Sequence, residues 1–392
     1  MSTSATKKQR AAPTKTPPAF SRDVKLEALA QSCTRFLAGD GIRTADKLLA
    51  LISPETAIDY YGLGGAVTEL ETEVAALLGK ESALFFPTGT MAQQTTIRVH
   101  ADRRQRRSVA FHPACHMETN EERGYQHLHG LFGVPVGPRE EPLSLASLAQ
   151  VREPIAALLL ELPQRALGGT LPSWKELVAQ TDWARERGAA AHLDGARLWE
   201  ATPFYKAKHR KSIVDIAGLF DTVYVSFYKG LGGIAGCCVA GDVALIEELS
   251  VWRTRHGGRS FGLWPYAASA LTALRMRLPR MPAYYRHAVA IAAAVRDIPG
   301  VEVLPEPVQS PMMHVRFSAG LDAIRERVVE IARTDKVWTF ARPWASLGPK
   351  LQEFELSVGD ATLQFSPEEI RDLFIRMVNT PRARKSAPRS RR

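Results

Sequence analysis

Two stretches of the sequence, AAAHLDGARLWEA at residues 189–201 and VYVSFYKGLGGIAG at 223–236, decide the fold. Each is an apolar run that delivers one charged residue, Asp194 in the first stretch and Lys229 in the second. A charge at the end of a buried strand is costly unless it has a partner. The two residues, about 35 residues apart in the chain, therefore indicate a functional site.

The apolar runs predict a mostly parallel sheet. The clearest of them are SALFFP (82–87), SVAF (108–111), IAALLLEL (155–162), AAAHLD (189–194) and TVYVSF (222–227). Such runs, alternating with segments of helical spacing, are typical of a parallel sheet covered on both faces. Ligands bind these sheets outside the carboxyl ends of the strands. We therefore expect an α/β fold with Asp194 and Lys229 at one ligand-binding edge.

The composition divides the chain into four parts. We expect a basic tail at 1–22, a large α/β domain at 23–280, a smaller α+β domain at 281–380 and a second basic tail at 381–392. The runs VEVLPE, MMHVRF and EFELSVG supply strands for the smaller domain. Both tails are rich in Ser, Thr, Pro and Ala, and we expect them to be disordered.

The net charge of +10 comes from the tails. They hold 11 of the 51 basic residues and no acidic residue, so 40 basic and 41 acidic residues remain between them. Polybasic tails bind phosphate backbones weakly and without sequence preference. We therefore expect the function to reside in the body of the chain, with no dedicated nucleic-acid partner.

Several absences restrict the class of protein. No apolar run approaches the roughly 18 residues of a membrane span, and the N-terminal stretch lacks the apolar core of a secretory signal. The four cysteines form no C-x-x-C pair. Pro113 disfavours the helix that would put His112 and His116 on one metal ion. We expect a soluble cytoplasmic protein without a metal site.

A lysine at a strand end flanked by small residues suits Schiff-base chemistry. Desolvation lowers the pKa of an ammonium group and frees the amine to attack a carbonyl. Pyridoxal phosphate enzymes add an acidic partner for the pyridinium nitrogen of the cofactor, and Asp194 is a candidate for that partner. The glycines after Lys229 are not a dinucleotide fingerprint, because an apolar strand rather than a helix follows them.

A phosphate cradle and a stacking residue complete the candidate cofactor site. The turn PTGTMA offers Thr88, Gly89 and Thr90 at a helix N-terminus, where backbone amides and the helix dipole favour phosphate. His116, in HPACHMETNEERG, follows a strand and could stack on the ring.

Each of these residues also has a purely structural explanation. Lys229 could be an ordinary strand-end lysine, and Asp194 or the Thr-Gly-Thr turn an ordinary helix N-cap. His116 could be a packed histidine, and Arg197, three residues after Asp194 and a further candidate, could be a solvated helix residue. Their combination favours the cofactor site.

With these segments in this order, the chain resembles the threonine aldolase and β-eliminating lyase family of fold-type I pyridoxal phosphate enzymes. The resemblance runs from about Tyr60 to Leu278, and more loosely through the smaller domain. DGAR at 194–197 with KGLG at 229–232 is its specific part. PTGT and the histidine segment, in which Glu121 comes five residues after His116, support it.

The resemblance implies how the cofactor is held. Lys229 would carry pyridoxal 5′-phosphate as a Schiff base, Asp194 would pair with the pyridine nitrogen, and His116 would stack on the ring. The residues implied to hold the phosphate are Thr88, Gly89, Thr90 and Ser226.

The resemblance also implies a substrate site and an assembly. Arg197 would hold the carboxylate of an amino-acid substrate, a bidentate task that suits a guanidinium. Arg253 falls where the family has a basic cluster near the subunit interface, and is carried over as a substrate-binding residue. A homodimer or homotetramer is implied, because such sites borrow residues from a neighbouring subunit.

Three departures from the family pattern concern the substrate. Leu162, Pro163 and Gln164 stand where threonine aldolases have Asn-Thr-His, and a glutamine cannot act as a general base. The N-terminal Arg-Ser-Asp-Thr stretch of the family is missing. The run KLQEFELSVG has no clear counterpart of a carboxylate-binding arginine. The cofactor is therefore better supported than the substrate.

We expect a lyase that cleaves a β-hydroxy-α-amino acid to glycine and an aldehyde by a retro-aldol reaction. With Gln164 in place of histidine, a water or His116 would take the hydroxyl proton. β-Elimination or transamination on the same scaffold is the alternative, and in elimination Lys229 would remove the α-proton. An alternative of another class is a non-catalytic protein that binds nucleic acid through its basic tails.

Overall fold

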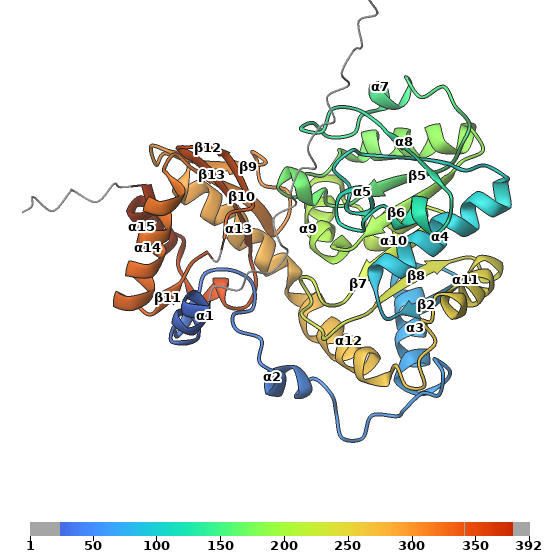
Figure 1. The fold of residues 1–392 in the computed structure, drawn as a ribbon, viewed down its shortest axis with the longest axis horizontal. Coiled ribbons are helices and arrows are strands. Elements are labelled where there is room, and N and C mark those ends of the chain that lie inside the picture. The colour runs from blue at the N-terminus through green and yellow to red at the C-terminus, as the bar shows by residue number, and fades with distance from the viewer. Residues whose placement is uncertain (1–23, 341, 379–392) are drawn as a thin grey trace, which may run out of the picture.

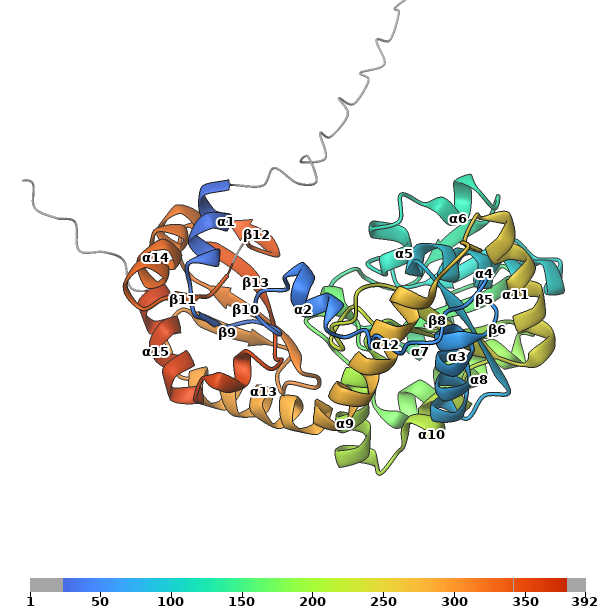
Figure 2. The ribbon, with the colours of Figure 1, turned by 90° about the horizontal axis from the view of Figure 1, so that it is seen from below.

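The computed structural model describes residues 24–340 and 342–378. The basic tails predicted at 1–22 and 381–392 lie outside the described residues. Figures 1 and 2 show two lobes, each built on its own sheet and joined by α12 (Trp264–Arg277) and α13 (Met281–Val295).

The larger lobe is built on a seven-stranded sheet in the order β2-β8-β7-β6-β5-β3-β4. Its strands are β2 (Ser82–Phe86), β3 (Ser108–Phe111), β4 (Phe132–Pro135), β5 (Ile155–Glu161), β6 (Ala190–Gly195), β7 (Thr222–Ser226) and β8 (Cys237–Gly241). Strand β8 is antiparallel to its neighbours β2 and β7, and the other pairs are parallel. The predicted mostly parallel sheet is confirmed, and the predicted apolar runs are five of its strands.

Helices cover both faces of this sheet, which explains the near-continuous apolar runs. Successive strand residues face opposite cores: Phe85 packs with α3 (Gly65–Leu78), and Phe86 packs with α4 (Gly89–Arg104) and α11 (Val243–Arg255). The other helices between residues 45 and 263 are α2 (Ala45–Leu49), α5 (His116–Thr119), α6 (Gly124–His127), α7 (Leu145–Leu148), α8 (Trp174–Glu186), α9 (Leu198–His209) and α10 (Ile213–Gly218), with the 3-10 turn η1 (Arg165–Leu167).

The smaller lobe has a four-stranded antiparallel sheet in the order β12-β13-β10-β9. Its strands are β9 (Val301–Leu304), β10 (Met312–Phe317), β12 (Ala345–Gly348) and β13 (Leu351–Ser357). The helices that accompany them after α13 are α14 (Leu321–Thr334) and α15 (Pro367–Val378), with the 3-10 turn η3 (Thr362–Gln364). The predicted runs VEVLPE, MMHVRF and EFELSVG supply β9, β10 and β13.

The first described residues lie with the smaller lobe. Helix α1 (Val24–Gln31) contacts α14, and β1 (Arg35–Phe36) pairs in parallel with β11 (Val337–Trp338). This pairing attaches the N-terminal segment to the smaller lobe, although the sequence predicts that the large domain begins at residue 23. The predicted division at 280 and 281 falls at the turn η2 (Leu278–Arg280) between α12 and α13 and remains a proposal.

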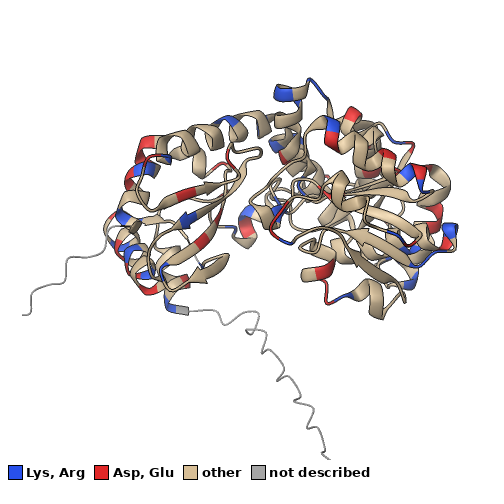
Figure 3. Ribbon diagram, turned by 90° about the horizontal axis from the view of Figure 1, so that it is seen from above, with Lys and Arg blue, Asp and Glu red and all other residues tan. Residues whose placement is uncertain are grey.

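No helix within the described residues is long and apolar enough to cross a membrane. Figure 3 shows basic and acidic residues mixed over the helices of both lobes. This mixture fits the near balance of charge in the body of the chain.

Candidate active site

Asp194 and Lys229 lie at the same edge of the large sheet. Asp194 is in β6, and Lys229 comes three residues after Ser226, the last residue of β7. Strands β6 and β7 are parallel neighbours in which Asp194 pairs in register with Tyr224. Because the carboxyl ends of parallel neighbours meet at one edge, the structure brings the two charged residues together.

The carboxylate of Asp194 is buried, with 2% of the residue exposed. It accepts a hydrogen bond from the N–H of Ala196 at 3.1 Å. Burial and the charge of Glu161 raise the pKa of Asp194 to about 7, against the opposing effect of His116. A cation placed beside this carboxylate would stabilise its ionised form.

The pKa of the Lys229 amine is shifted downward, opposite to that of Asp194. Burial, and then the positive charges of Arg197 and Arg165, lower the pKa of Lys229 to about 8, while Asp194 and Glu355 oppose the shift. More of the amine is therefore unprotonated near neutral pH, which favours attack on a carbonyl.

His116, the first residue of α5, is held by a buried carboxylate. Its Nδ1 lies 3.0 Å from Oε1 of Glu121, and Gln94 Nε2 donates to Oε2 of the same carboxylate at 3.1 Å. Burial would lower the pKa of His116, but the hydrogen bond to Glu121 and the charge of Asp194 outweigh it and raise the pKa. Because a carboxylate only accepts, the neutral form of the ring carries its proton on Nδ1 and has Nε2 as the acceptor.

The predicted phosphate cradle lies at the N-terminus of α4. Thr88 is the N-cap, and its side chain accepts from the N–H of Met91. A Cβ on Gly89 would lie 2.2 Å from the hydroxyl of Tyr224, so only glycine fits there. Thr88 and Thr90 are exposed, and Gly89 between them is buried.

Ser226 lies beside this cradle. Strand pairing aligns it with Cys237, which in turn pairs with Phe86, two residues before the N-cap. The residue is 1% exposed, and its Oγ has no hydrogen-bond partner within the described structure. A buried hydroxyl without a partner is costly, and a phosphate oxygen would satisfy it.

Arg197, the N-cap of α9, stands between two carboxylates. Its Nε lies 3.5 Å from Oε2 of Glu200, and its Nη2 lies 3.9 Å from Oε1 of Glu355 in β13. Neither distance is that of a close ion pair, so the guanidinium can still take a substrate carboxylate in bidentate fashion.

Sequence reasoning missed three residues of this group: Arg165, Glu200 and Glu355. Glu200 is 6% exposed, and burial raises its pKa to about 7. Its carboxylate lies so close to Gly230 that a Cβ there would be 1.9 Å from Oε1. Glu355 lies in the strand where the family arginine has no counterpart.

A cavity of about 380 Å³ connects this group to the smaller lobe. Its walls include Arg43, Arg197, Glu200, Lys229 and Glu355. The cavity therefore offers a space for a small substrate beside the amine of Lys229 and the guanidinium of Arg197.

Of the site residues predicted from the sequence, Arg197 and Lys229 line this cavity, whereas Arg253 and Gln164 do not. Arg253 is buried in the larger lobe, where its Nη1 donates to the carbonyl of Phe85 at 2.8 Å and lies 3.9 Å from Oε1 of Glu71. The structure does not bring it to Lys229. Gln164 is 8% exposed and donates through Nε2 to Oε2 of Glu161 at 3.1 Å.

Comparisons with known proteins give the family of the chain. A family model described as beta-eliminating lyase matches residues 55–318. Low-specificity L-threonine aldolase 1 of Arabidopsis thaliana is 28% identical over 289 residues, which cover 71% of this chain and 79% of the relative.

Solved structures extend the likeness to the whole fold. A candidate L-allo-threonine aldolase of Listeria monocytogenes EGD-E is 37% identical with a TM-score of 0.84, over 90% of this chain and 98% of that one. A serine palmitoyltransferase of S. paucimobilis with a bound pyridoxal phosphate–myriocin adduct is 16% identical with a TM-score of 0.63, over 87% of this chain and 86% of that one. The second likeness shows the fold alone.

Proposed function

Since this chain belongs to the beta-eliminating lyase family and is a threonine-aldolase-like, pyridoxal-phosphate-dependent amino acid lyase, we propose that it cleaves a β-hydroxy-α-amino acid to glycine and an aldehyde. The observation that carries the proposal is the placement of Lys229, Asp194 and Arg197 around one edge of the sheet, beside a cavity of about 380 Å³.

The residues at this edge fit pyridoxal phosphate. Buried Asp194, whose pKa is raised to about 7, suits a pyridinium nitrogen. The unpartnered Oγ of Ser226 and the N-terminus of α4 suit a phosphate. The amine of Lys229 would bind the aldehyde carbon, and His116 would lie against the ring. When bound, the cofactor would supply an electron sink for the pair left on the substrate Cα.

Arg197 would bind and orient the substrate. Its guanidinium would hold the α-carboxylate and so fix which bond to Cα is broken. Glu200 and Glu355, at 3.5 and 3.9 Å from Arg197, restrain the guanidinium from two sides. The substrate carboxylate would compete with these two carboxylates for the same donors.

His116 is our candidate for the group that takes the hydroxyl proton. Gln164 has no basic atom for this task, and its amide already donates to Glu161. Nε2 of His116 is the free acceptor of a ring whose Nδ1 bonds Glu121. As the proton moves from the β-hydroxyl oxygen to Nε2, the C–O bond becomes a carbonyl and the Cα–Cβ bond breaks, leaving its electron pair on Cα.

β-Elimination is the second candidate reaction, and the lowered pKa of Lys229 favours it. An amine with a pKa of about 8 is suited to remove a proton from Cα. The products separate the reactions, because elimination yields a keto acid and ammonia instead of glycine and an aldehyde. The family finding favours both over a non-catalytic protein that binds nucleic acid.

We also propose a homo-oligomer in the cytoplasm. Tyr60, Tyr61 and Phe261 are 56%, 50% and 64% exposed and pack edge to face, which leaves an apolar group on the surface for a second copy to cover. The four cysteines are free and buried, as in proteins of reducing compartments.

The absorption spectrum of the purified protein tests the cofactor, before and after borohydride reduction and with peptide mapping of the reduced lysine. The expected result is a yellow chromophore trapped on Lys229, and a protein that takes up no added pyridoxal phosphate would overturn the proposal. Product analysis with β-hydroxy amino acids then tests the reaction. Lys229→Ala should abolish turnover.

A further inference from the structure

The loop that carries Lys229, residues 228–233, is supported from outside. Gly232 N–H donates to the carbonyl of Lys229 within the loop at 3.1 Å, and Gly233 N–H donates to the carbonyl of Phe227, the residue before the loop, at 2.7 Å. Other carbonyl groups of the loop take their partners from distant parts of the chain.

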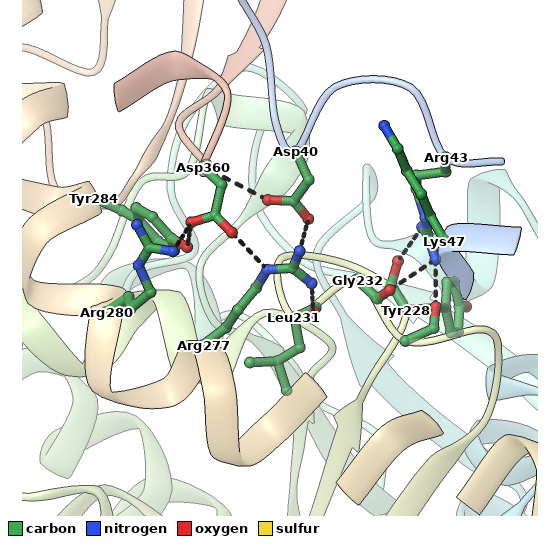
Figure 4. Close-up of polar contacts among 12 residues, drawn as sticks. Asp40, Arg43, Lys47, Tyr228, Leu231, Gly232, Arg277, Arg280, Tyr284 and Asp360 are labelled. Carbon is green, nitrogen blue, oxygen red and sulfur yellow. Dashed lines mark hydrogen bonds and ion pairs between the residues drawn. The ribbon is translucent and has the colours of Figure 1, made fainter. Parts of the chain in front are cut away.

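Arg43, in the segment before α2, provides partners for three of these carbonyls. Its Nη1 donates to Tyr228 at 3.3 Å, and its Nη2 donates to Gly232 at 3.0 Å and also to Gly233. Figure 4 shows the side chain reaching the loop from this segment. The contacts therefore bracket Lys229 along the main chain.

Arg277, near the junction of the two lobes, holds the same loop at Leu231, whose carbonyl accepts from Nη1 at 2.5 Å. Arg277 also pairs with Asp40 at 3.5 Å and with Asp360 at 3.3 Å (Figure 4). Since Asp40 is three residues before Arg43, the segment between them is fixed at one end by Arg277 and at the other by the loop.

A guanidinium suits the position of Arg43 better than an ammonium group does. Its planar fork presents donors toward separate carbonyl groups in a rigid arrangement, whereas an ammonium is a compact point charge on a flexible stem. Arg43 lines the same cavity as Lys229 and Arg197. However, its terminal nitrogens are engaged by main-chain oxygens, which assigns it to the protein rather than to the substrate.

We propose that Arg43 is a positioning residue for Lys229: by binding the main chain on both sides of the lysine, it fixes where the amine stands. The inference rests on the proposed function in assigning the reaction to Lys229. Displacing a reacting group by about 1 Å can lower the rate by about 10²-fold. Removing the support of this loop is therefore expected to lower kcat.

The first test needs neither cofactor nor substrate. Amide hydrogen exchange is measured in Arg43→Ala, Arg43→Lys and Lys47→Ala. Lys47 is the matched control, because it lies four residues further along and donates to Ile42 in its own segment at 3.4 Å. The amides of Gly232 and Gly233 should exchange about tenfold faster in Arg43→Ala, less so in Arg43→Lys, and as in the wild type in Lys47→Ala.

The second test separates positioning from substrate binding. In the loaded enzyme, Arg43→Ala should lower kcat by about 10- to 100-fold with KM within about twofold. Added guanidinium at a non-denaturing concentration should restore part of kcat, whereas ammonium should not. Arg43→Lys should fall between Arg43→Ala and the wild type.

Unchanged exchange and unchanged kcat in Arg43→Ala would overturn the inference, as would an effect on KM alone. If Arg43→Ala does not fold, the same outcomes in Arg43→Lys decide. A wild-type protein that cannot be labelled on Lys229 by pyridoxal phosphate would overturn the proposed function, while faster exchange in the variants would still support the role of Arg43 in the loop.

Discussion

Arg165 and Glu355, 190 residues apart in the chain, form a bidentate ion pair between the two lobes, with Nε–Oε2 at 2.6 Å and Nη2–Oε1 at 3.3 Å. The guanidinium of Arg165 also stacks over Trp344, 4.5 Å from the ring centroid. The two charges act in opposite directions on the pKa of Lys229. The pair therefore joins the lobes and tunes the reactive amine.

Neutralising Glu355 and neutralising Arg165 should move the pKa of Lys229 in opposite directions. Glu355→Gln removes a negative charge, so the pKa should fall below about 8, whereas Arg165→Gln should raise it toward the ordinary 10.5. The measurement is the pH dependence of acylation of Lys229 in the cofactor-free protein, followed by peptide mapping. Arg185→Gln, which removes an exposed cation paired with Asp182, is the control. Shifts of the same sign in the two variants would contradict this account.

The central part of the site could be predicted because each residue is marked locally. Asp194 and Lys229 end apolar runs, and the parallel order of β6 and β7 brings such ends together without further information. The prediction missed Glu200, although it lies in the stretch 189–201, three residues after Arg197. Helical spacing puts such a pair on one face and could have revealed it.

The rest of the site depends on contacts between distant segments. Arg43 reaches a loop 185 to 190 residues away, and Arg165 reaches Glu355 across the junction of the lobes. Nothing in the local pattern marks these partners, because their placement follows from the packing of the smaller lobe on the larger one. The attachment of β1 to β11 was missed for the same reason.

Asp194 should make the cofactor-free protein less stable as the pH rises. Its pKa is raised from 3.8 to about 7, so between these values the folded state holds a proton that the unfolded state has lost. Stability is then lost as the pH rises from about 4 to about 7. Asp194→Asn lacks this pH dependence. The Tm of the variant minus the Tm of the wild type should therefore become more positive as the pH rises from about 4 to about 7.

Asp215 provides a control of opposite sign. Its hydrogen bonds with Ser212 lower its pKa, so its contribution is present above the ordinary value and is lost as the pH falls. The amount by which the Tm of Asp215→Asn lies below that of the wild type should therefore become smaller as the pH is lowered. A difference in Tm between wild type and Asp194→Asn that does not change with pH would refute the assignment.

Glu121 should control the protonation of His116. Glu121→Gln removes the charge that helps raise the pKa of His116, so burial should then lower the pKa. If His116 accepts the hydroxyl proton, the acidic limb of the kcat–pH profile should move to lower pH. Glu122→Gln, which changes the neighbouring exposed carboxylate, should leave the profile as it is. An unmoved limb in Glu121→Gln would instead indicate that a water takes the proton.

Arg197 should govern substrate binding more than turnover. Arg197→Gln removes the donors for the α-carboxylate, so KM should rise by about 10- to 100-fold with a smaller change in kcat. Glu200→Gln should act in the opposite direction, because it removes the carboxylate that lies 3.5 Å from Nε of Arg197 and competes with the substrate. Steady-state kinetics with a β-hydroxy amino acid measure both effects.

Arg210→Gln, at the far end of the same helix, is the control. Equal KM values in Arg197→Gln and the wild type would place the carboxylate elsewhere, with Arg165 as the next residue to test.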